Sequence, residues 1–112
     1  MLSPEDYSEG WNFGPNKEDV ASVSELVDIM AKSWGGQASW KVDNASHPHE
    51  ARLLTLDCSK ASEKLIWKSI WNLDRALKET IEWYKGWNNN KDMHQFSLSQ
   101  IEYYQKEYLA DE

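Results

Sequence analysis

The sequence predicts a helix-rich α/β fold with three to four helices and two or three short strands. Apolar residues recur at helical spacing in several stretches. Two shorter aromatic stretches either alternate or run into a Gly-Pro turn, which is typical of strands. With 112 residues, 40% of them hydrophobic, the chain can build one core but not two. We therefore expect a single domain over residues 1–112.

The expected strands occupy three places. Residues 9–14 (EGWNFG) form an aromatic run that ends in a Gly-Pro turn, and residues 38–42 (ASWKV) alternate with period two. Residues 51–57 hold three leucines and are interpreted as extended. Two short strands do not form an independent sheet, so they need a partner strand or helices that carry the core.

The first two helices are predicted over residues 22–34 and 59–65. Ser22 and Glu25 have capping-box spacing, and Gly35-Gly36 supplies the left-handed residue that commonly ends a helix. Ser59 can cap the short second helix. We expect Ala61 and Leu65 to face inward from it.

The last two helices are expected over residues 72–87 and from Ser97 onward. The first opens at Asn72 or Asp74 and stops at the Asn-rich residues 88–90. Ser97 and Gln100 repeat the capping-box spacing. The apolar side chains of these helices are Leu73, Leu77, Ile81 and Tyr84 in one, and Leu98, Ile101, Tyr104 and Tyr108 in the other.

Charge and composition exclude several classes of partner. The formal net charge of -7 disfavours nonspecific nucleic-acid binding and docking on anionic membranes. No apolar run approaches the roughly 20 residues of a membrane span. The lone Cys58 excludes an intrachain disulfide and is typical of a reducing compartment. We therefore expect a cytoplasmic protein with no nucleic-acid or membrane partner.

Familiar catalytic motifs are absent from the sequence. The five glycines do not form a dinucleotide-binding fingerprint, and there is no Walker loop or nucleophile elbow. No tyrosine is followed by lysine four positions later. We expect no catalytic residue and no bound cofactor in this chain.

One dense polar cluster, His47-Pro48-His49-Glu50, leaves three alternatives open. Its residue types suit zinc, with Cys58 or His94 completing a set, but the spacing matches no known zinc motif. His and Glu also suit hydrogen bonds to a base or ribose. The spacing alone favours a solvated polar loop, and we expect no metal site.

The tryptophans divide into two groups. Trp11 and Trp40, in the expected strands, are candidates for stacking on a base or sugar. The helical tryptophans are better explained as core residues: Trp67, Trp71, Trp83 and Trp87.

Several ordered segments together resemble one family. They are residues 11–15 (WNFGP), 47–51 (HPHEA), 56–61 (LDCSKA) and a run of Trp, Leu and Ala positions over 65–84. This combination resembles the C-terminal part of sugar-nucleotide dehydratases of the extended short-chain dehydrogenase/reductase (NAD-dependent epimerase/dehydratase) family, nearest to the branch that acts on CDP-glucose. Each piece alone is weak, but the order is specific and extends over roughly residues 9–104.

The resemblance implies that cofactor binding and substrate binding belong to two different domains. In this family an N-terminal Rossmann domain binds NAD, and a smaller C-terminal lobe holds the sugar nucleotide. The glycine fingerprint and the catalytic Tyr and Lys lie upstream of the matching part. The resemblance thus implies a truncated or separated substrate lobe that is non-catalytic alone and binds a sugar nucleotide weakly, because affinity depends on covering most of the ligand.

The resemblance also implies particular substrate contacts. Glu50 matches the position of a nucleotide-contacting carboxylate, and His47 stands where the wider family has arginine. His49 and Trp11 complete the expected substrate-binding set. Ile66 and Ile70 replace a glycine and a proline of the family pattern, which alters the turn around Trp67.

A second hypothesis is an interaction module. Without a Rossmann domain, the lobe would expose an apolar face and strand edges, which are association sites. We then expect a homodimer or a higher oligomer formed through that face.

Overall fold

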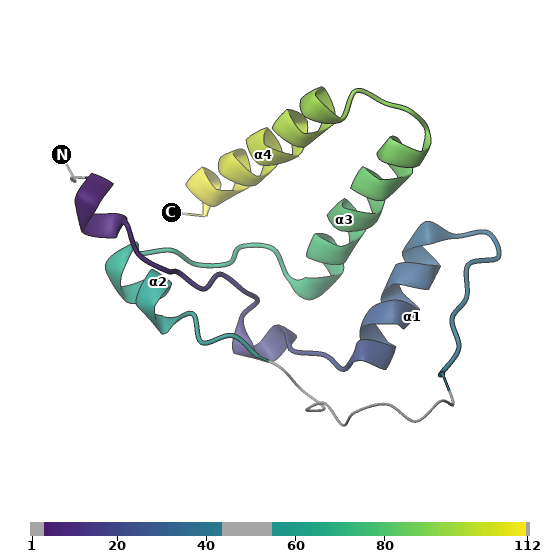
Figure 1. Ribbon diagram of the computed structural model, residues 1–112, viewed down its shortest axis with the longest axis horizontal. Helices are drawn as coiled ribbons and strands as arrows, with labels where there is room; N and C mark the ends of the chain where they lie inside the picture. The colour runs from purple at the N-terminus through teal and green to yellow at the C-terminus, as the bar shows by residue number, and fades with distance from the viewer. Residues whose placement is uncertain (1–3, 44–54, 112) are drawn as a thin grey trace.

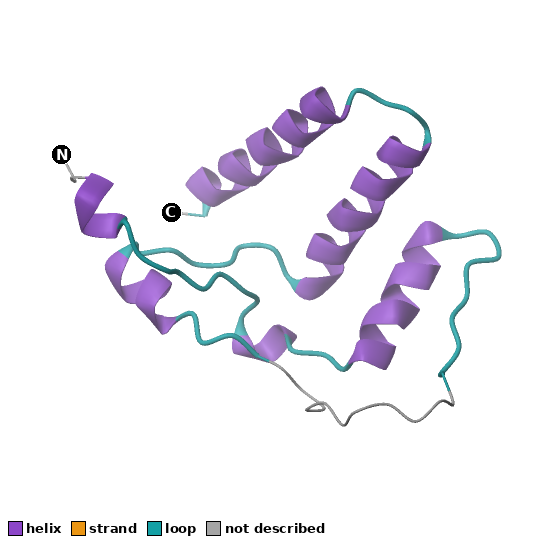
Figure 2. Ribbon diagram, in the orientation of Figure 1, coloured by secondary structure: helices purple, strands orange, loops and turns teal. Residues whose placement is uncertain are grey.

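The computed structural model describes residues 4–43 and 55–111, and over these ranges it is all helical, with no strand (Figures 1 and 2). The elements are the 3-10 turns η1 (Pro4–Tyr7) and η2 (Lys17–Asp19) and the helices α1 (Val23–Trp34), α2 (Ser59–Lys64), α3 (Leu73–Asn88) and α4 (Met93–Ala110). The predicted number of helices is confirmed, whereas the predicted α/β class is wrong.

The described residues of the expected strands pair with no neighbouring strand, and their hydrogen bonds are local turns and side-chain contacts. In residues 9–14, the Gly10 carbonyl accepts from Lys60 Nζ at 2.8 Å. Residues 38–42 approach α1 through Trp40 Nε1, which donates to Asp28 Oδ1 at 2.8 Å. Residues 55–57 of the third expected strand are also irregular, and its residues 51–54 lie outside the described ranges. Aromatic content bounded by Gly and Pro therefore marked irregular segments, not strands.

The predicted ends of α1 and α3 are confirmed. Ser22 Oγ accepts from the Glu25 amide at 3.3 Å, and Gly35 ends α1 with a φ of 82°. Asn72 Oδ1 accepts from the Arg75 amide at 2.9 Å at the start of α3. That helix stops within the Asn-rich stretch, where Asn90 takes a φ of 59°.

The caps of α4 and α2 differ from expectation. α4 begins four residues before Ser97, because Asp92 Oδ1 accepts from the amides of His94 at 3.1 Å and Gln95 at 3.2 Å. Ser97 lies inside α4, where its hydroxyl accepts from Trp83 Nε1 at 2.9 Å. In α2 the N-cap residue is Cys58, which makes no side-chain cap bond, and the expected cap Ser59 is instead the first helical residue, with its amide donating to Asp57 Oδ1 at 2.9 Å.

The helices form one layer with a thin core. α3 packs against α1 on one side and against α4 on the other, while α2 lies beside the N-terminal segment (Figure 1). Among the described hydrophobic side chains, only Ala61 and Ile81 are buried. Burial of Ala61 was predicted, but Leu65 and Tyr84 are exposed. No helix in the described ranges is long and apolar enough to cross a bilayer.

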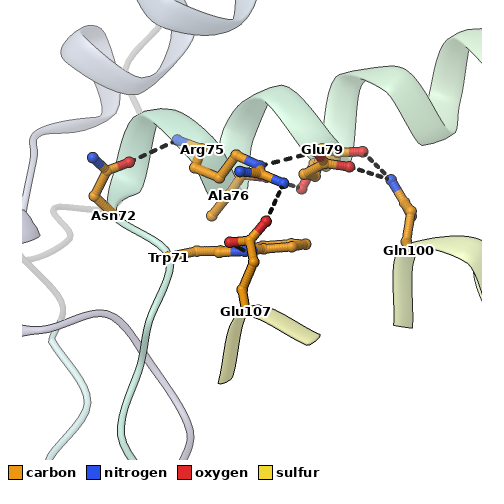
Figure 3. A network of polar contacts seen from close by, with 8 residues as sticks. Trp71, Asn72, Arg75, Ala76, Glu79, Gln100 and Glu107 are labelled. Atoms are coloured by element: carbon orange, nitrogen blue, oxygen red, sulfur yellow. Dashed lines mark hydrogen bonds and ion pairs between the residues drawn. The ribbon is translucent and has the colours of Figure 1, made fainter. Parts of the chain in front are cut away.

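A polar network fixes α4 against α3 (Figure 3). Arg75 bonds to Glu79 on its own helix at 3.0 Å and to Glu107 of α4 at 2.7 Å. Gln100 Nε2 donates back to the Glu79 carbonyl at 2.7 Å. The charge-assisted bond between Arg75 and Glu107 and the neutral bond from Gln100 to the Glu79 carbonyl join the two helices at two separate points along the hairpin.

Candidate functional site

A cavity of about 930 Å³ lies where residues 14–21 meet residues 55–69, which are distant from them in sequence. Its walls come from residues 14–21, residues 55–63 and residues 67–69, with Leu26 and Leu73 adding apolar surface. A volume of this size falls in the range of small-molecule sites. It is therefore the candidate binding site of the described part of the chain.

The first wall is held against the other two by close contacts. Asn16 Nδ2 donates to the Ser69 carbonyl at 3.3 Å, and the rings of Phe13 and Trp67 meet edge to face with centroids 5.1 Å apart. A Cβ on Gly14 would lie 3.4 Å from both Cys58 Sγ and a Leu56 side-chain carbon. These are ordinary van der Waals distances, so the WNFGP segment lies directly against the LDCSKA segment at this point.

The second wall is organised by Asp57. Its Oδ1 accepts from the Ser59 hydroxyl at 2.6 Å and from the Ser59 amide at 2.9 Å. Both bonds lower the pKa of Asp57 below its ordinary value, and the bond from the Ser59 hydroxyl has the larger effect. The charge of Lys17 lowers this pKa further. Asp57 is therefore an anion at neutral pH that orients the start of α2.

The cavity combines an apolar body with polar groups of both signs. Trp67, Leu26 and Leu73 provide the apolar surface, and the polar groups are Asn16, Lys17, Asp19, Asp57, Ser59, Ser62, Glu63, Lys68 and Ser69. Lys68 on this wall forms an ion pair with Asp111 at 2.7 Å. The charged residues of the lining are two lysines and three carboxylates, so the cavity offers hydrogen-bond donors and acceptors beside its apolar surface.

The predicted substrate-binding residues lie in two regions. His47, His49 and Glu50 fall outside the described ranges, and Thr55 on the cavity wall is the first described residue after them. Their role stays a prediction.

Trp11 is described but does not line the cavity. Its ring nitrogen donates to the Tyr7 carbonyl at 3.0 Å, and its ring stacks with the Tyr7 ring at a centroid distance of 6.2 Å. Lys60 Nζ lies 4.6 Å from the centroid of the Trp11 ring. The contacts bind Trp11 to η1 and α2, and its predicted substrate contact remains untested.

The described residues contain no cluster of side chains that could bind a metal ion. No group of three or more His, Cys, Asp or Glu side chains there could hold an ion. His94 lies in the first turn of α4, whereas Cys58 precedes α2 and lines the cavity. The other residues of the metal alternative belong to 47–50, outside those ranges.

The cavity residues do not stand out in the sequence as site residues. Asn16, Asp57, Ser59 and Trp67 each lie in or beside a segment that carried the family resemblance. Their position in or beside those segments was the only signal in the sequence that could have pointed to them as cavity residues. Only the fold shows that residues 14–21 line the same cavity as residues 55–69, since residues 22–54 separate them in the sequence.

Comparison with known proteins agrees with the resemblance seen in the sequence. No family model matches the chain. Among curated proteins, it is 48% identical over 87 residues to CDP-glucose 4,6-dehydratase of Salmonella typhimurium, which covers 78% of this chain and 24% of that protein. It is also 29% identical over 87 residues to dTDP-glucose 4,6-dehydratase of the same organism, covering 72% of this chain and 23% of that protein. The chain thus spans about a quarter of the length of these relatives.

Proposed function

Because most of this chain is homologous to one segment of CDP-glucose 4,6-dehydratase, we propose that it is a dehydratase-like substrate lobe that holds a sugar nucleotide and performs no turnover on its own. The observation that carries the proposal is that residues 14–15 of one resemblance-bearing segment line the same cavity as residues of the much later resemblance-bearing segments 56–61 and 65–84. Such a convergence is expected of a binding site, because segments that only maintain a fold need not share a hollow.

The chemistry of the cavity supports a ligand with a sugar and a phosphate. Lys17 offers a cation to a phosphate, and the hydroxyls of Ser59 and Ser69 line the same hollow. Trp67 offers an aromatic surface to a ring. Glu50, His47 and His49 stay in the proposal as further nucleotide contacts, on the grounds of the resemblance.

The absence of turnover is proposed from the sequence. Hydride chemistry of this family needs a nucleotide-binding glycine fingerprint and a Tyr with Lys four positions on, and this chain contains neither pattern. The pure chain mixed with NAD and CDP-glucose should therefore give no dehydration product and no change in nicotinamide absorbance. Turnover by the pure chain would contradict this part of the proposal.

The single cysteine allows a direct test of ligand binding. Cys58 lines the cavity and is half-buried. Alkylation of Cys58 by iodoacetamide, followed by mass spectrometry, should slow several-fold in the presence of CDP-glucose and less with UDP-glucose or glucose. An alkylation rate that CDP, CDP-glucose and UDP-glucose all leave unchanged would argue against binding in this cavity.

A matched pair of variants makes the test specific. Lys17→Met removes the proposed phosphate contact and should weaken CDP-glucose binding, measured by tryptophan fluorescence. Lys32→Met, on the exposed side of α1, should leave it unchanged. Equal effects of the two variants would show that Lys17 contributes only general charge.

Self-association is the second candidate function. Large hydrophobic side chains are exposed along α3 and α4, which favours an interaction module. The strand edges expected from the sequence do not contribute, since the described residues form no strand.

A further inference from the structure

The backbone is strained at Ile66, next to the cavity. Ile66 directly follows Leu65, the C-cap of α2, and has a φ of 54°, in the left-handed region that favours glycine. A β-branched side chain makes this conformation unfavourable. The Ile66 side chain is 75% exposed, so its packing does not offset the strain. Contacts of the surrounding chain therefore have to hold this turn.

The turn at Ile66 places Trp67 in the cavity wall. The carbonyl of buried Ala61 accepts from the amides of Leu65 at 3.0 Å and Trp67 at 3.2 Å. The second bond spans Ile66, so it depends on the backbone conformation of that residue. Trp67 lines the cavity, and its ring meets the Phe13 ring edge to face with centroids 5.1 Å apart. The strained turn thus sets the position of an aromatic wall residue.

The end of α4 reaches the same turn. Tyr108 Oη donates to the Ile66 carbonyl at 3.2 Å. Asp111 Oδ2 pairs with Lys68 Nζ at 2.7 Å. Figure 1 shows the C-terminal end of α4 facing the segment that joins α2 to α3. The end of this helix therefore contacts the residues immediately before and after Trp67.

Of these two contacts, the hydrogen bond from Tyr108 is the better supported. The side chains of the ion pair are 51% and 56% exposed, and exposed ion pairs contribute little. Tyr108 is half-buried, and its ring stacks on Tyr104 with centroids 6.1 Å apart. Tyr104 in turn meets the Trp71 ring edge to face at 5.0 Å. Packed rings thus hold the Tyr108 hydroxyl in place.

We propose that Tyr108 is a positioning residue for the cavity: its hydroxyl holds the strained turn at Ile66 and so keeps Trp67 in the wall. Glycine would adopt this turn without strain, whereas isoleucine needs support from α4. The fraction of molecules with a formed wall then depends on Tyr108, and a ligand binds only to that fraction. The effect on ligand binding rests on the proposed function, but the effect on the wall does not.

Hydrogen exchange at the Trp67 amide, followed by NMR on the full chain, tests the wall without a ligand. In Tyr108→Phe this amide should exchange about three- to tenfold faster, the effect of one lost hydrogen bond. Gly35→Ala changes the end of α1, away from the turn, and should leave the rate unchanged. Equal acceleration in both variants would overturn the proposal, because Trp67 would then open only with the whole fold.

Tyr103→Phe is the matched control. Tyr103 is also on α4, 60% exposed and on another side of the helix from Tyr108, so its variant should not alter exchange at Trp67. Ile66→Gly, combined with Tyr108→Phe, should return the exchange rate toward the wild-type value, because glycine relieves the strain. A wild-type rate in Tyr108→Phe alone, or no rescue by Ile66→Gly, would overturn the proposal.

Protection of Cys58 from iodoacetamide by CDP-glucose tests the consequence for binding. Tyr108→Phe should raise the concentration needed for half protection several-fold, and added Ile66→Gly should lower it again. Faster exchange at Trp67 with unchanged protection would contradict a positioning role. If CDP-glucose does not protect Cys58 in the wild type, the proposed function fails, and the exchange rates alone still decide whether Tyr108 holds Trp67 in the wall.

Discussion

Arg75 Nη2 of α3 lies 2.7 Å from Glu107 Oε1 of α4, and this ion pair joins the first turn of one helix to the last turn of the other (Figure 3). Trp71 Nε1 donates to the second Glu107 oxygen at 2.8 Å, and the Arg75 guanidinium carbon lies 5.0 Å from the Trp71 ring centroid. Burial acts to lower the pKa of Arg75, but hydrogen bonds and charge from Glu79 and Glu107 outweigh it and raise that pKa. Arg75 is therefore a cation, and its contacts with Glu107 and Trp71 fix the far end of α4.

Glu107→Gln should lower the free energy of unfolding. The variant keeps the shape and one acceptor but removes the charge that faces Arg75. Since both side chains are more than a third exposed, the loss should be about 1 kcal/mol in urea denaturation. Glu102→Gln, on an exposed part of α4, is the control and should change stability by less than about 0.5 kcal/mol. Equal losses in both variants would contradict a specific role for the pair.

Stability should fall on acidification through Asp57 and Glu9. Hydrogen bonds from Ser59 lower the folded-state pKa of Asp57, and the hydrogen bond and charge of Lys60 lower that of Glu9. A lowered folded-state pKa stabilises the fold above the unfolded pKa of about 4, and this stabilisation is lost as pH falls through the folded-state value.

Asp57→Asn should therefore flatten the acid side of a plot of melting temperature against pH. Asp6→Asn, on exposed η1, should leave that slope intact. If the Asp57 variant kept the wild-type slope, the hydrogen bonds from Ser59 would not be present in solution.

Gly86→Ala should stabilise the protein. Gly86 is buried in α3, and a Cβ there would lie 3.4 Å from two Phe96 ring carbons and 3.6 Å from Met93 Cε, which is ordinary contact. Replacing glycine inside a helix gains up to about 1 kcal/mol. Thermal unfolding should show a higher midpoint. A lower midpoint would mean that α4 packs closer to α3 than the structure has it.

Gly35→Ala should have the opposite effect. Gly35 ends α1 with a φ of 82° and a ψ of -167°, a conformation almost confined to glycine. No atom lies within 4 Å of the position that the alanine methyl group would take, so the cost is backbone strain alone, about 1 to 3 kcal/mol. Gly10→Ala, also free of neighbours, is the control and should be nearly neutral. A neutral Gly35 variant would show that the end of α1 can adopt another conformation.

Local chemistry allowed the ends of most helices to be predicted, but it did not predict which faces of the helices are covered by other elements. Ser22, Asn72 and Gly35 act as the spacing predicted, because a cap depends on residues within one turn of the helix. The start of α4 was misplaced, since Asp92 and Ser97 both offer caps and the carboxylate accepts two amides. Trp87, interpreted as a core residue, is 62% exposed, because a helical stripe does not say whether another layer covers it.

By itself, the sequence determined the helices, the lack of dinucleotide-binding and Tyr-Lys patterns in these residues, and the similarity to one segment of CDP-glucose 4,6-dehydratase. These follow from local spacing and residue identity. Only the tertiary structure decided that residues 9–14 and 38–42 are not strands and that Gly14, Asp57 and Trp67 meet around one cavity. Strand pairing and cavity walls depend on contacts between distant residues, and their free energy is realised only when the chain brings those residues together.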